Sequence, residues 1–238
     1  PCGFDAHRAA HCFRSRRRRH QPQSFEPWPC WPSRSKKKEL TDWAPITKRF
    51  EDVFLGSIFL AVSLPLWPLI IIAIKSESPG PVFFRQRRRG RHQQVFEVLK
   101  FRTMSVMEDG DDVRQAQPGD SRVTFVGRIL RRTSLDEFPQ FINVIRGEMS
   151  LVGPRPHALV HDEEFSRLLE KYPDRHQMRP GMTGLAQVSG LRGSTAAPGS
   201  IEARVEADLA YIKSWSLGLD LKILSKTFWA VVAGTNAD

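Results

Sequence analysis

The chain contains an uncharged, apolar run of 22 residues from Val53 to Ile74, and this run limits the folds available to the chain more than any other feature. A helix needs about 20 apolar residues to cross a hydrocarbon core of roughly 30 Å, so the run is long enough for a membrane. Pro65 and Pro68 lie near its middle, where a proline removes a backbone donor and clashes with the preceding turn. The run therefore predicts a bent segment, with the hydroxyl of Ser63 beside the bend to satisfy a free carbonyl group.

The flanks of the run favour entry into the bilayer without crossing. Each half would reach about 15 to 18 Å, roughly half of the hydrocarbon core. Basic residues lie on both sides, and such residues stay on the cytoplasmic face. A proline-kinked transmembrane helix is the first alternative, and it would place one flank on the wrong side. A buried helix of a soluble core is disfavoured because no polar stripe interrupts the run. The basic flanks are Lys36, Lys37, Lys38, Lys48 and Arg49 before the run and Lys75, Arg85, Arg87, Arg88, Arg89 and Arg91 after it.

The net charge of +10 suggests nucleic-acid binding only until the charges are located along the chain. Residues 1–40 carry ten basic and three acidic side chains, whereas residues 101–238 carry seventeen and eighteen. The excess therefore lies mostly in an N-terminal tail, residues 1–45, which lacks apolar periodicity and is predicted to be disordered. Beside a membrane segment, a solvated run or one that binds anionic lipid is a better interpretation of Arg16 to Arg19 than RNA binding, so we expect no specific nucleic-acid partner.

All three cysteines, Cys2, Cys12 and Cys30, lie in this tail. Their spacing matches neither a paired metal site nor a disulfide framework, which fits a reducing compartment. The tail also lacks the apolar core and the cleavage site of a secretory signal. The sequence begins with Pro1 rather than Met, which is compatible with a fragment whose upstream domains are missing.

Two short strands, residues 82–84 and 95–98, are predicted to form a β-hairpin around the cluster Arg87 to Arg91. Lys100 and Arg102 follow the second strand at a spacing of two, so on an extended strand they share a face. Two cations on one face suit an anionic ligand, and a solvated face is the alternative.

Four amphipathic patterns predict helices in the rest of the chain. They cover residues 125–132, 162–172, 201–212 and 217–232. The last pattern interleaves aromatic residues with Lys222 and Lys226, as in a helix that lies in a membrane interface. Packing of that helix against the core is the equal alternative.

Two stretches are predicted loops. Residues 108–120 are acidic, but Asp109, Asp111 and Asp112 lack the spacing of an EF-hand, so a metal site there is not favoured. Residues 180–199 are rich in glycine and have the length of a functional loop.

The sequence from Ser134 to Glu137 fits a capping box, with Ser134 as the N-cap of a helix and Glu137 at its third position. Asp136 and Glu137 then occupy a first helical turn, where the helix dipole favours carboxylates for structural reasons alone. The chemical alternative is a nucleophile or metal-ligand pair. An Asp carboxylate beside Mg²⁺ and several arginines can attack a phosphorus atom, because the cations reduce the repulsion between two anions. The nearby arginines are Arg128, Arg131 and Arg132.

Arg155 lies between Pro154 and Pro156. Both prolines fix φ, so Arg155 sits on a stiff loop and loses little freedom when it binds a phosphate with two hydrogen bonds.

Together these segments resemble the bacterial sugar transferases, also called monotopic phosphoglycosyl transferases. The resemblance runs in order from about residue 46 to residue 234. It depends on the number and order of the segments, since each one is short. One departure is the sequence Ser63-Leu64-Pro65, where some relatives have a Ser-Pro pair. The matching segments are KRFED at 48–52, GPVFFRQ at 80–86, KFRTM at 100–104, LDEFPQ at 135–140, LVGPRP at 151–156, RPGMTGLAQVSG at 179–190, DLAYI at 208–212 and WSLGLD at 215–220.

The resemblance implies an α/β fold that is rich in helix and has small β-hairpin elements. It implies a monotopic membrane protein with a re-entrant helix-break-helix segment and interfacial amphipathic helices. The implied parts are the tail at 1–45, the re-entrant region at 46–78 and a catalytic domain at 79–238 on the cytoplasmic face of the bacterial inner membrane.

The resemblance also implies a transferase. A sugar 1-phosphate passes from a UDP-sugar to polyprenyl (undecaprenyl) phosphate and UMP leaves, at the first membrane step of exopolysaccharide, O-antigen or other glycoconjugate synthesis. Asp136 is the implied nucleophile, which forms a covalent phosphosugar intermediate, and Glu137 assists with Mg²⁺ or with proton handling. Asp136 and Glu137 are thus also the implied metal ligands. The candidate phosphate-binding residues are Lys100, Arg102, Arg128, Arg132 and Arg155.

Two rival functions stay open at this point. A membrane-bound, Mg²⁺-dependent phosphohydrolase would use the same aspartate but need no lipid phosphate. A basic scaffold would bind anionic lipid or RNA through residues 1–40 without catalysis. The expected partners of the transferase are a UDP-sugar, polyprenyl phosphate and membrane lipids, with glucose or galactose as the expected sugar. The sequence leaves open whether the chain forms a homo-oligomer.

Overall fold

The computed structural model of the chain describes residues 44–105, 119–191 and 199–233. The predictions for residues 1–43 of the tail and for the acidic loop, including Asp109, Asp111 and Asp112, lie outside the described residues. Within them the chain is rich in helix and forms two small sheets, which confirms the predicted α/β class.

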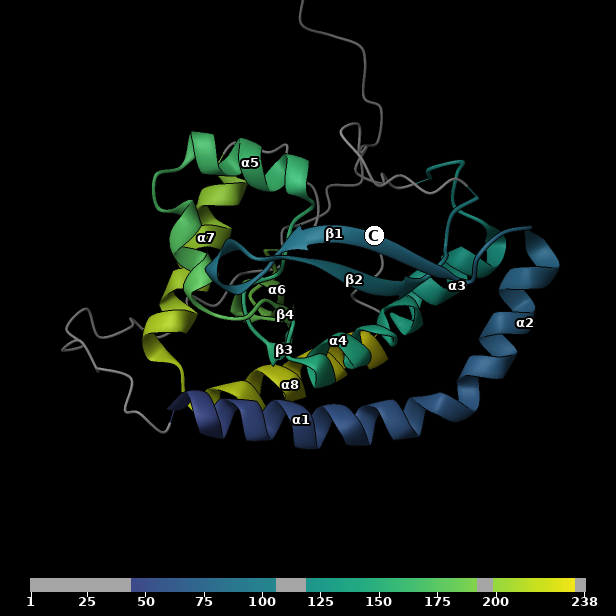
Figure 1. The fold of residues 1–238 in the computed structure, drawn as a ribbon, viewed down its shortest axis with the longest axis horizontal. Coiled ribbons are helices and arrows are strands. Elements are labelled where there is room, and N and C mark those ends of the chain that lie inside the picture. Colours follow the sequence, from purple (N-terminus) through teal and green to yellow (C-terminus); the bar gives the residue numbers. More distant parts are fainter. Residues whose placement is uncertain (1–43, 106–118, 192–198, 234–238) are drawn as a thin grey trace, which may run out of the picture. The chain divides into compact units, whose positions relative to one another are not determined.

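The apolar run forms two helices joined by a short 3-10 turn. α1 (Ala44–Ser63) continues into the turn η1 (Leu64–Leu66) and then into α2 (Trp67–Glu77). Figure 1 shows α2 turning away from the line of α1 at this turn. The interruption contains Pro65 and lies directly before Pro68, so the predicted bend at the prolines is confirmed.

The helices that follow agree with the sequence in most places. They are α3 (Phe125–Arg132), η3 (Leu135–Glu137), α4 (Gln140–Arg146), α5 (Leu159–Leu168), η4 (Tyr172–Gln177), α6 (Leu185–Val188), α7 (Ser200–Ser214) and α8 (Leu217–Val232). The helices expected at 125–132, 201–212 and 217–232 are confirmed. The prediction at 162–172 is wrong at both ends, because α5 begins at Leu159 and ends at Leu168, where the extended backbone of Leu169 stops it, and Tyr172 begins a separate turn.

Two small sheets lie among the described helices. β1 (Phe83–Arg89) pairs antiparallel with β2 (Val95–Phe101), so the predicted hairpin is confirmed with longer strands. β3 (Ser150–Val152) pairs in parallel with β4 (Gly181–Thr183). β4 lies in the stretch 180–199 that the sequence predicted as loop. A Cβ atom on Gly181 would lie 2.1 Å from the backbone nitrogen of Gly153, so this close pairing requires glycine.

The buried side chains of α1 are largely polar and its exposed side chains are largely apolar, which is the reverse of a helix in a soluble protein. Pro45–Glu77 is, among the described residues, the helical segment long and apolar enough to cross a membrane, and 17% of its most apolar window is buried. In a soluble protein the apolar face is buried and the polar face is exposed. The alternative of a buried core helix is therefore wrong. The exposed side chains include Ile46, Phe50, Phe54, Ile58 and Val62, and the buried ones include Lys48, Glu51, Asp52 and Ser63.

Buried polar contacts fasten the inner face of α1 to the rest of the fold. Lys48 Nζ lies 2.7 Å from Asp220 Oδ2 on α8 and 3.6 Å from Asp52 Oδ1. Asp52 Oδ1 also accepts hydrogen bonds from Ser150 Oγ at 2.8 Å and from the backbone N–H of Leu151 at 2.9 Å. These contacts join α1 to α8 and to β3.

Contacts of Ser63 and Trp67 stabilise the bend between α1 and α2. Ser63 Oγ donates to the carbonyl of Leu60 at 2.8 Å and accepts a hydrogen bond from Trp67 Nε1 at 3.2 Å. The Trp67 ring in turn packs against Phe83 on β1 and Phe101 on β2, with centroid distances of 5.9 and 5.3 Å. The aromatic contacts fasten α2 to the hairpin.

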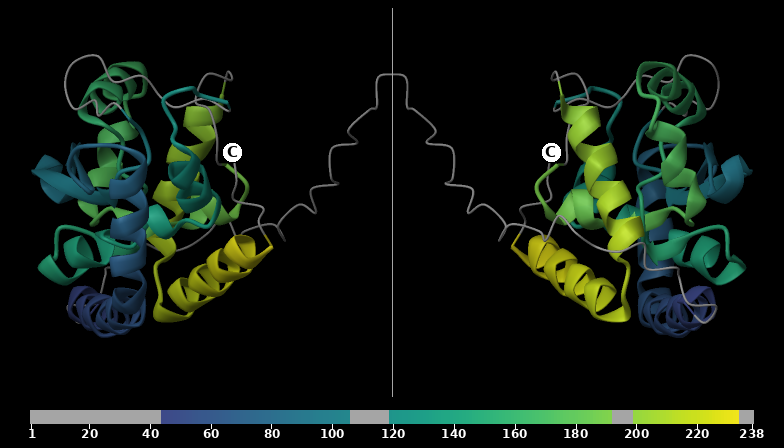
Figure 2. Two further views of the ribbon diagram at one scale, coloured as in Figure 1. Left: turned by 90° about the vertical axis from the view of Figure 1, so that its right-hand side faces the viewer. Right: turned by 90° about the vertical axis from the view of Figure 1, so that its left-hand side faces the viewer.

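Both α1 and α8 expose apolar side chains. Both helices lie along the same side of the molecule in Figures 1 and 2. On α8, Ile223 is buried against the core, whereas Phe228 and Trp229 are 63% and 65% exposed. The last helix thus packs with one face and presents aromatic side chains with the other, so both expectations for it hold in part.

We predict that Lys48→Met lowers the free energy of unfolding by about 3–5 kcal/mol, because it leaves the buried carboxylates of Asp52 and Asp220 without their cation. Urea unfolding of the detergent-solubilised protein, followed by tryptophan fluorescence, measures the change. As a control, Arg85→Gln breaks an exposed ion pair with Glu97 of 3.7 Å and should change stability by about 0.5 kcal/mol or less. Equal losses in the two variants would contradict the role of the buried pair.

Candidate active site

Asp136 and Glu137 lie on η3, a 3-10 turn, and the α-helix begins only at Gln140. Ser134 adopts left-handed backbone, with a φ of 56°, and its side chain makes no capping hydrogen bond. The predicted capping box is therefore wrong. The physical reason is that the Glu137 side chain binds cations from two other elements instead of turning back to the backbone of Ser134.

Glu137 joins three parts of the chain. Its Oε1 lies 2.8 Å from Lys100 Nζ on β2 and 2.7 Å from Arg155 Nη2 on the loop after β3. Burial alone would raise the pKa of Glu137, but the charges of Arg155 and Lys100 and their hydrogen bonds lower it below its usual range. Glu137 is therefore ionised at neutral pH, and two of the predicted cations meet at it.

Asp136 has a different environment. It is 9% exposed, and its carboxylate accepts no hydrogen bond from the residues that the structure describes. Burial is the main cause that raises the pKa of this carboxyl to about 6, against the attraction of Lys100, while the charge of Glu137 raises it further. Two adjacent carboxyls thus have pKa values shifted in opposite directions, a pattern typical of sites where two carboxyls take different roles.

One arginine of α3 acts on this carboxylate. Arg131 is half-buried, its Nε donates to Thr103 Oγ1 at 2.9 Å, and its charge favours the ionised form of Asp136. Arg128 and Arg132 are exposed on the same helix, and within the described part of the chain they form no ion pair with either carboxylate. The sequence placed all three arginines near the acidic pair, but helix periodicity did not show which one turns inward.

Arg102 does not follow Lys100 to the carboxylates. β2 ends at Phe101, so the alternation that would put both cations on one face does not continue. Arg102 is buried, and its guanidinium donates to the carbonyl oxygens of Ser78 at 2.7 Å and Pro79 at 2.5 Å. It stabilises the turn after α2.

The loop that carries Arg155 is held by its backbone. The carbonyl oxygens of residues 154, 155 and 156 each accept a hydrogen bond. The donors, in that order, are the backbone N–H of Gly181 and the guanidinium groups of Arg175 and Arg88. Burial and the nearby charge of Arg155 lower the pKa of Arg88 to about 10, so it stays cationic. The sequence did not indicate Arg175 and Arg88, because no local pattern links them to a loop 20 and 68 residues away.

The acidic pair fits Mg²⁺ only together with a phosphate ligand. No group of three or more His, Cys, Asp or Glu side chains able to hold a metal occurs in the described ranges. Mg²⁺ is commonly bound by one or two carboxylates plus the phosphates of a substrate. Asp136, buried and without a hydrogen bond from the residues with described positions, offers hard oxygen ligands of this kind, whereas Oε1 of Glu137 is already shared by two cations.

This arrangement is suited to bind and attack an anion. Lys100, Arg131 and Arg155 supply positive charge around two carboxylates. That of Glu137 is ionised and paired, whereas that of Asp136 is buried and has no hydrogen bond or ion pair among the described residues. Guanidinium and ammonium groups at such spacing bind phosphate oxygens with charge-assisted hydrogen bonds. An unpaired carboxylate beside them is placed to act as a nucleophile.

Comparison with known proteins gives one family and several similar proteins. The family described as bacterial sugar transferase matches residues 43–234. A UDP-glucose:undecaprenyl-phosphate glucose-1-phosphate transferase of Caulobacter vibrioides is 52% identical over 192 residues, which cover 81% of this chain and 72% of that protein. A protein of the same name from Escherichia coli is 50% identical over 182 residues, 76% of this chain and 39% of that protein.

A third relative differs in its sugar. The UDP-N-acetylgalactosamine-undecaprenyl-phosphate N-acetylgalactosaminephosphotransferase of Aeromonas hydrophila is 40% identical over 190 residues, which cover 80% of this chain and 44% of that protein. The chain therefore spans less than half the length of the Escherichia and Aeromonas relatives.

We predict that Asp136→Asn stabilises the fold above about pH 6 but not near pH 4. Folding raises the pKa of this carboxyl from 3.8 to about 6, so the folded chain binds the proton more tightly than the unfolded chain does. Ionisation therefore opposes folding: the penalty is absent below about pH 4, grows as the pH rises, and reaches about 2–3 kcal/mol above pH 6. Asn carries no charge and avoids the penalty.

Thermal unfolding of both proteins between about pH 4 and pH 8, without divalent cations, measures this difference. The matched control is Asp174→Asn at an exposed position, which should shift the unfolding temperature little at any pH. A stability difference for Asp136→Asn that is the same at every pH would contradict the raised pKa.

Proposed function

This chain belongs to the bacterial sugar transferase family, and we propose that it transfers a sugar 1-phosphate from a UDP-sugar to undecaprenyl phosphate. The observation that carries the proposal is the carboxylate of Asp136, which is buried beside Glu137, Lys100 and Arg155 and forms no hydrogen bond within the described part of the chain. The names of the relatives at 52% and 50% identity supply the substrates. Glucose is the proposed sugar, and the Aeromonas relative indicates that the family as a whole is not limited to it.

The proposed reaction has two displacements at Asp136. In the first, a carboxylate oxygen of Asp136 attacks the phosphorus that bears the sugar, the bond from this phosphorus to the UMP oxygen breaks, and UMP leaves. In the second, a phosphate oxygen of undecaprenyl phosphate attacks the same phosphorus and releases the carboxylate, which gives the lipid diphosphate sugar. Splitting the exchange in this way lets two unlike substrates use one site in turn.

The cations bind and orient the phosphates. Arg155 and Lys100 hold Glu137 through one of its oxygens, and we propose that their other donors bind phosphate oxygens of the UDP-sugar. Asp136 and Glu137 would also hold Mg²⁺, which when bound adds positive charge near the phosphates. Glu137 keeps the cations in place while Asp136 reacts.

The exposed apolar side chains support a re-entrant, monotopic placement at the cytoplasmic face of the inner membrane. A lipid phosphate stays at the headgroups and a nucleotide sugar stays in water, so the two meet only in the interface. The bent pair α1 and α2 exposes apolar side chains, and α8, which lies on the same side in Figure 2, exposes Phe228 and Trp229. Aromatic side chains of this kind favour headgroup depth.

We predict that Asp136→Asn lowers kcat on the order of 10³-fold or more, because an amide is too weak a nucleophile to form the acyl phosphate bond to phosphorus. The assay supplies UDP-glucose labelled in the sugar, undecaprenyl phosphate and Mg²⁺ and measures label in the lipid. Asp174→Asn is the exposed control and should retain activity. In the wild-type protein, one equivalent of UMP should appear without lipid acceptor.

Two results of this assay and one of a deletion variant would contradict the proposal. Equal transfer by Asp136→Asn would remove Asp136 as the nucleophile. Steady release of free sugar phosphate without lipid would indicate a phosphohydrolase. A function that survives Asp136→Asn but is lost when residues 1–40 are deleted would indicate a basic scaffold.

We predict that both ends of the apolar segment are accessible from one face of the membrane. The natural cysteines are replaced with serine, and Thr47→Cys and Ser76→Cys, at exposed positions, are labelled singly with a membrane-impermeant maleimide. A re-entrant segment should give labelling of both in inverted inner-membrane vesicles and of neither in sealed spheroplasts. Labelling of the two positions from opposite faces would show a transmembrane helix instead.

A further inference from the structure

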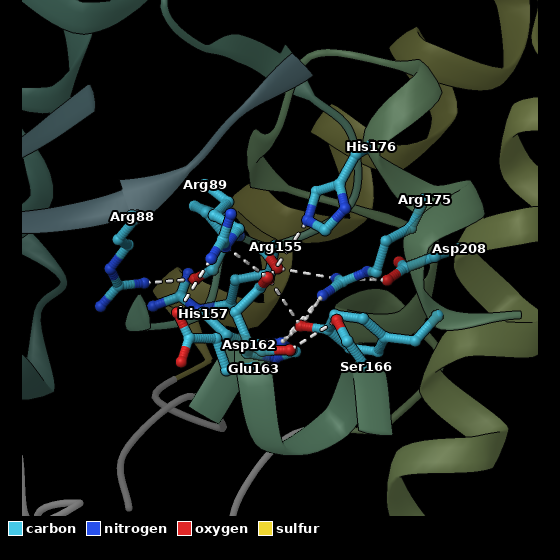
Figure 3. Close-up of polar contacts among 12 residues, drawn as sticks. Arg88, Arg89, Arg155, His157, Asp162, Glu163, Ser166, Arg175, His176 and Asp208 are labelled. Atoms are coloured by element: carbon cyan, nitrogen blue, oxygen red, sulfur yellow. Dashed lines mark hydrogen bonds and ion pairs between the residues drawn. The ribbon is translucent and has the colours of Figure 1, made fainter. Parts of the chain in front are cut away.

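Arg175 contacts the loop that carries Arg155 at the carbonyl of residue 155 and at the side chain of His157 (Figure 3). It is 3% exposed, and its Nη2 donates to the carbonyl oxygen of Arg155 at 2.7 Å. The same nitrogen lies 2.6 Å from Asp208 Oδ2 on α7. Its Nη1 donates to the hydroxyl of Tyr172 at 3.0 Å and lies 2.8 Å from His157 Nδ1. One guanidinium therefore binds the loop at two positions, the backbone of residue 155 and the side chain of residue 157.

The contact with His157 has a fixed direction. Burial, followed by repulsion from Arg175 and Arg88, lowers the pKa of His157 well below its usual value, so the ring is neutral. A guanidinium only donates hydrogen bonds, so Nδ1 accepts and the ring proton lies on Nε2. The same Nδ1 lies 2.7 Å from the hydroxyl of Tyr172, so the ring, the hydroxyl and the guanidinium form one cluster.

Stability alone is a weak reason for this arrangement. In a buried ion pair such as Arg175 and Asp208, the loss of hydration offsets most of the attraction. The pair does supply geometry, because a planar guanidinium with fixed donors holds its partners in defined directions. Asp208 engages one edge of the guanidinium, and the loop lies within reach of both terminal nitrogens.

The loop transmits this geometry to the site. The backbone carbonyl of Arg155 accepts a hydrogen bond from Arg175, while the guanidinium of Arg155 donates to Glu137. Pro154 and Pro156 fix φ on either side, so little of a backbone shift can be absorbed next to residue 155. A change at Arg175 therefore moves the base from which the Arg155 guanidinium projects.

We propose that Arg175, held by Asp208, is a positioning residue that sets the place of the Arg155 guanidinium for phosphate binding. The inference rests on the proposed function, since it takes the phosphates of the UDP-sugar as the ligand of Arg155. Arg175 itself has no role in contacting the substrate.

The test is a double-mutant cycle between Arg175 and Arg155 in the lipid-transfer assay. Arg175→Lys keeps the charge but not the fork of donors, and it should raise KM for UDP-glucose roughly tenfold or more with a smaller change in kcat. Arg155→Lys should have a similar effect. In the Arg155→Lys background, Arg175→Lys should add no more than about a twofold change, because the group that it positions is already lost.

Glu163→Gln is the matched control, because it breaks the 2.9 Å pair of Glu163 with Arg89 in the same network without touching the loop. It should leave both constants unchanged. If Arg175→Lys fails to fold by thermal unfolding, Asp208→Asn replaces it in the cycle. Independent, multiplicative effects of the two sites in a folded variant overturn the inference, and so does failure of both variants to fold, which would give Arg175 and Asp208 a structural role only. Absence of transfer by the wild-type protein would instead overturn the proposed function.

Discussion

The polar inner face of α1 is the constraint on which the position of the site depends. Asp52 on this face accepts hydrogen bonds from β3, the strand that leads into the Arg155 loop. On the other arm of the bend, Trp67 packs edge-on against Phe101, next to Lys100 on β2. Each arm of the apolar segment is thus fastened to a strand that carries a cation of the site or leads into the loop that carries one. These contacts tie the site to the helices that expose apolar side chains, as the proposed reaction between a lipid phosphate and a water-soluble nucleotide requires.

Local patterns predicted the parts of the fold that depend on neighbours in sequence. The two prolines predicted the break after α1, alternation predicted the hairpin, and helical periodicity predicted α3, α7 and α8. The prediction failed where tertiary contacts decide: the Ser134 cap is absent because Glu137 pairs with distant cations. The parallel pair of β3 and β4 was missed because strands of three residues carry too little pattern to be recognised.

The candidate site could be predicted as a set of residues but not as an arrangement. The sequence and its resemblance placed Asp136 and Glu137 together with a group of cations, and the structure brings Lys100 and Arg155 to Glu137. It turns Arg102 to a backbone turn instead, because the strand ends one residue earlier. Which cation faces inward depends on where a strand or helix stops, and boundaries are the least certain part of any pattern.

The two neighbouring carboxyls differ because, among the residues that the structure describes, Glu137 has ion-pair partners and Asp136 has none. Glu137 has two cations on one oxygen, whereas Asp136 is buried without a hydrogen bond from the described residues. Near neutral pH both are ionised, but only the charge of Asp136 is poorly compensated, as its pKa of about 6 reflects. In the proposed reaction, bond formation to phosphorus removes that charge from the buried oxygen. Before attack, the fold holds a poorly compensated charge on Asp136. After attack, that charge lies on a phosphate bound by Lys100 and Arg155, where it is better compensated. This difference in electrostatic stabilisation lowers the barrier to attack.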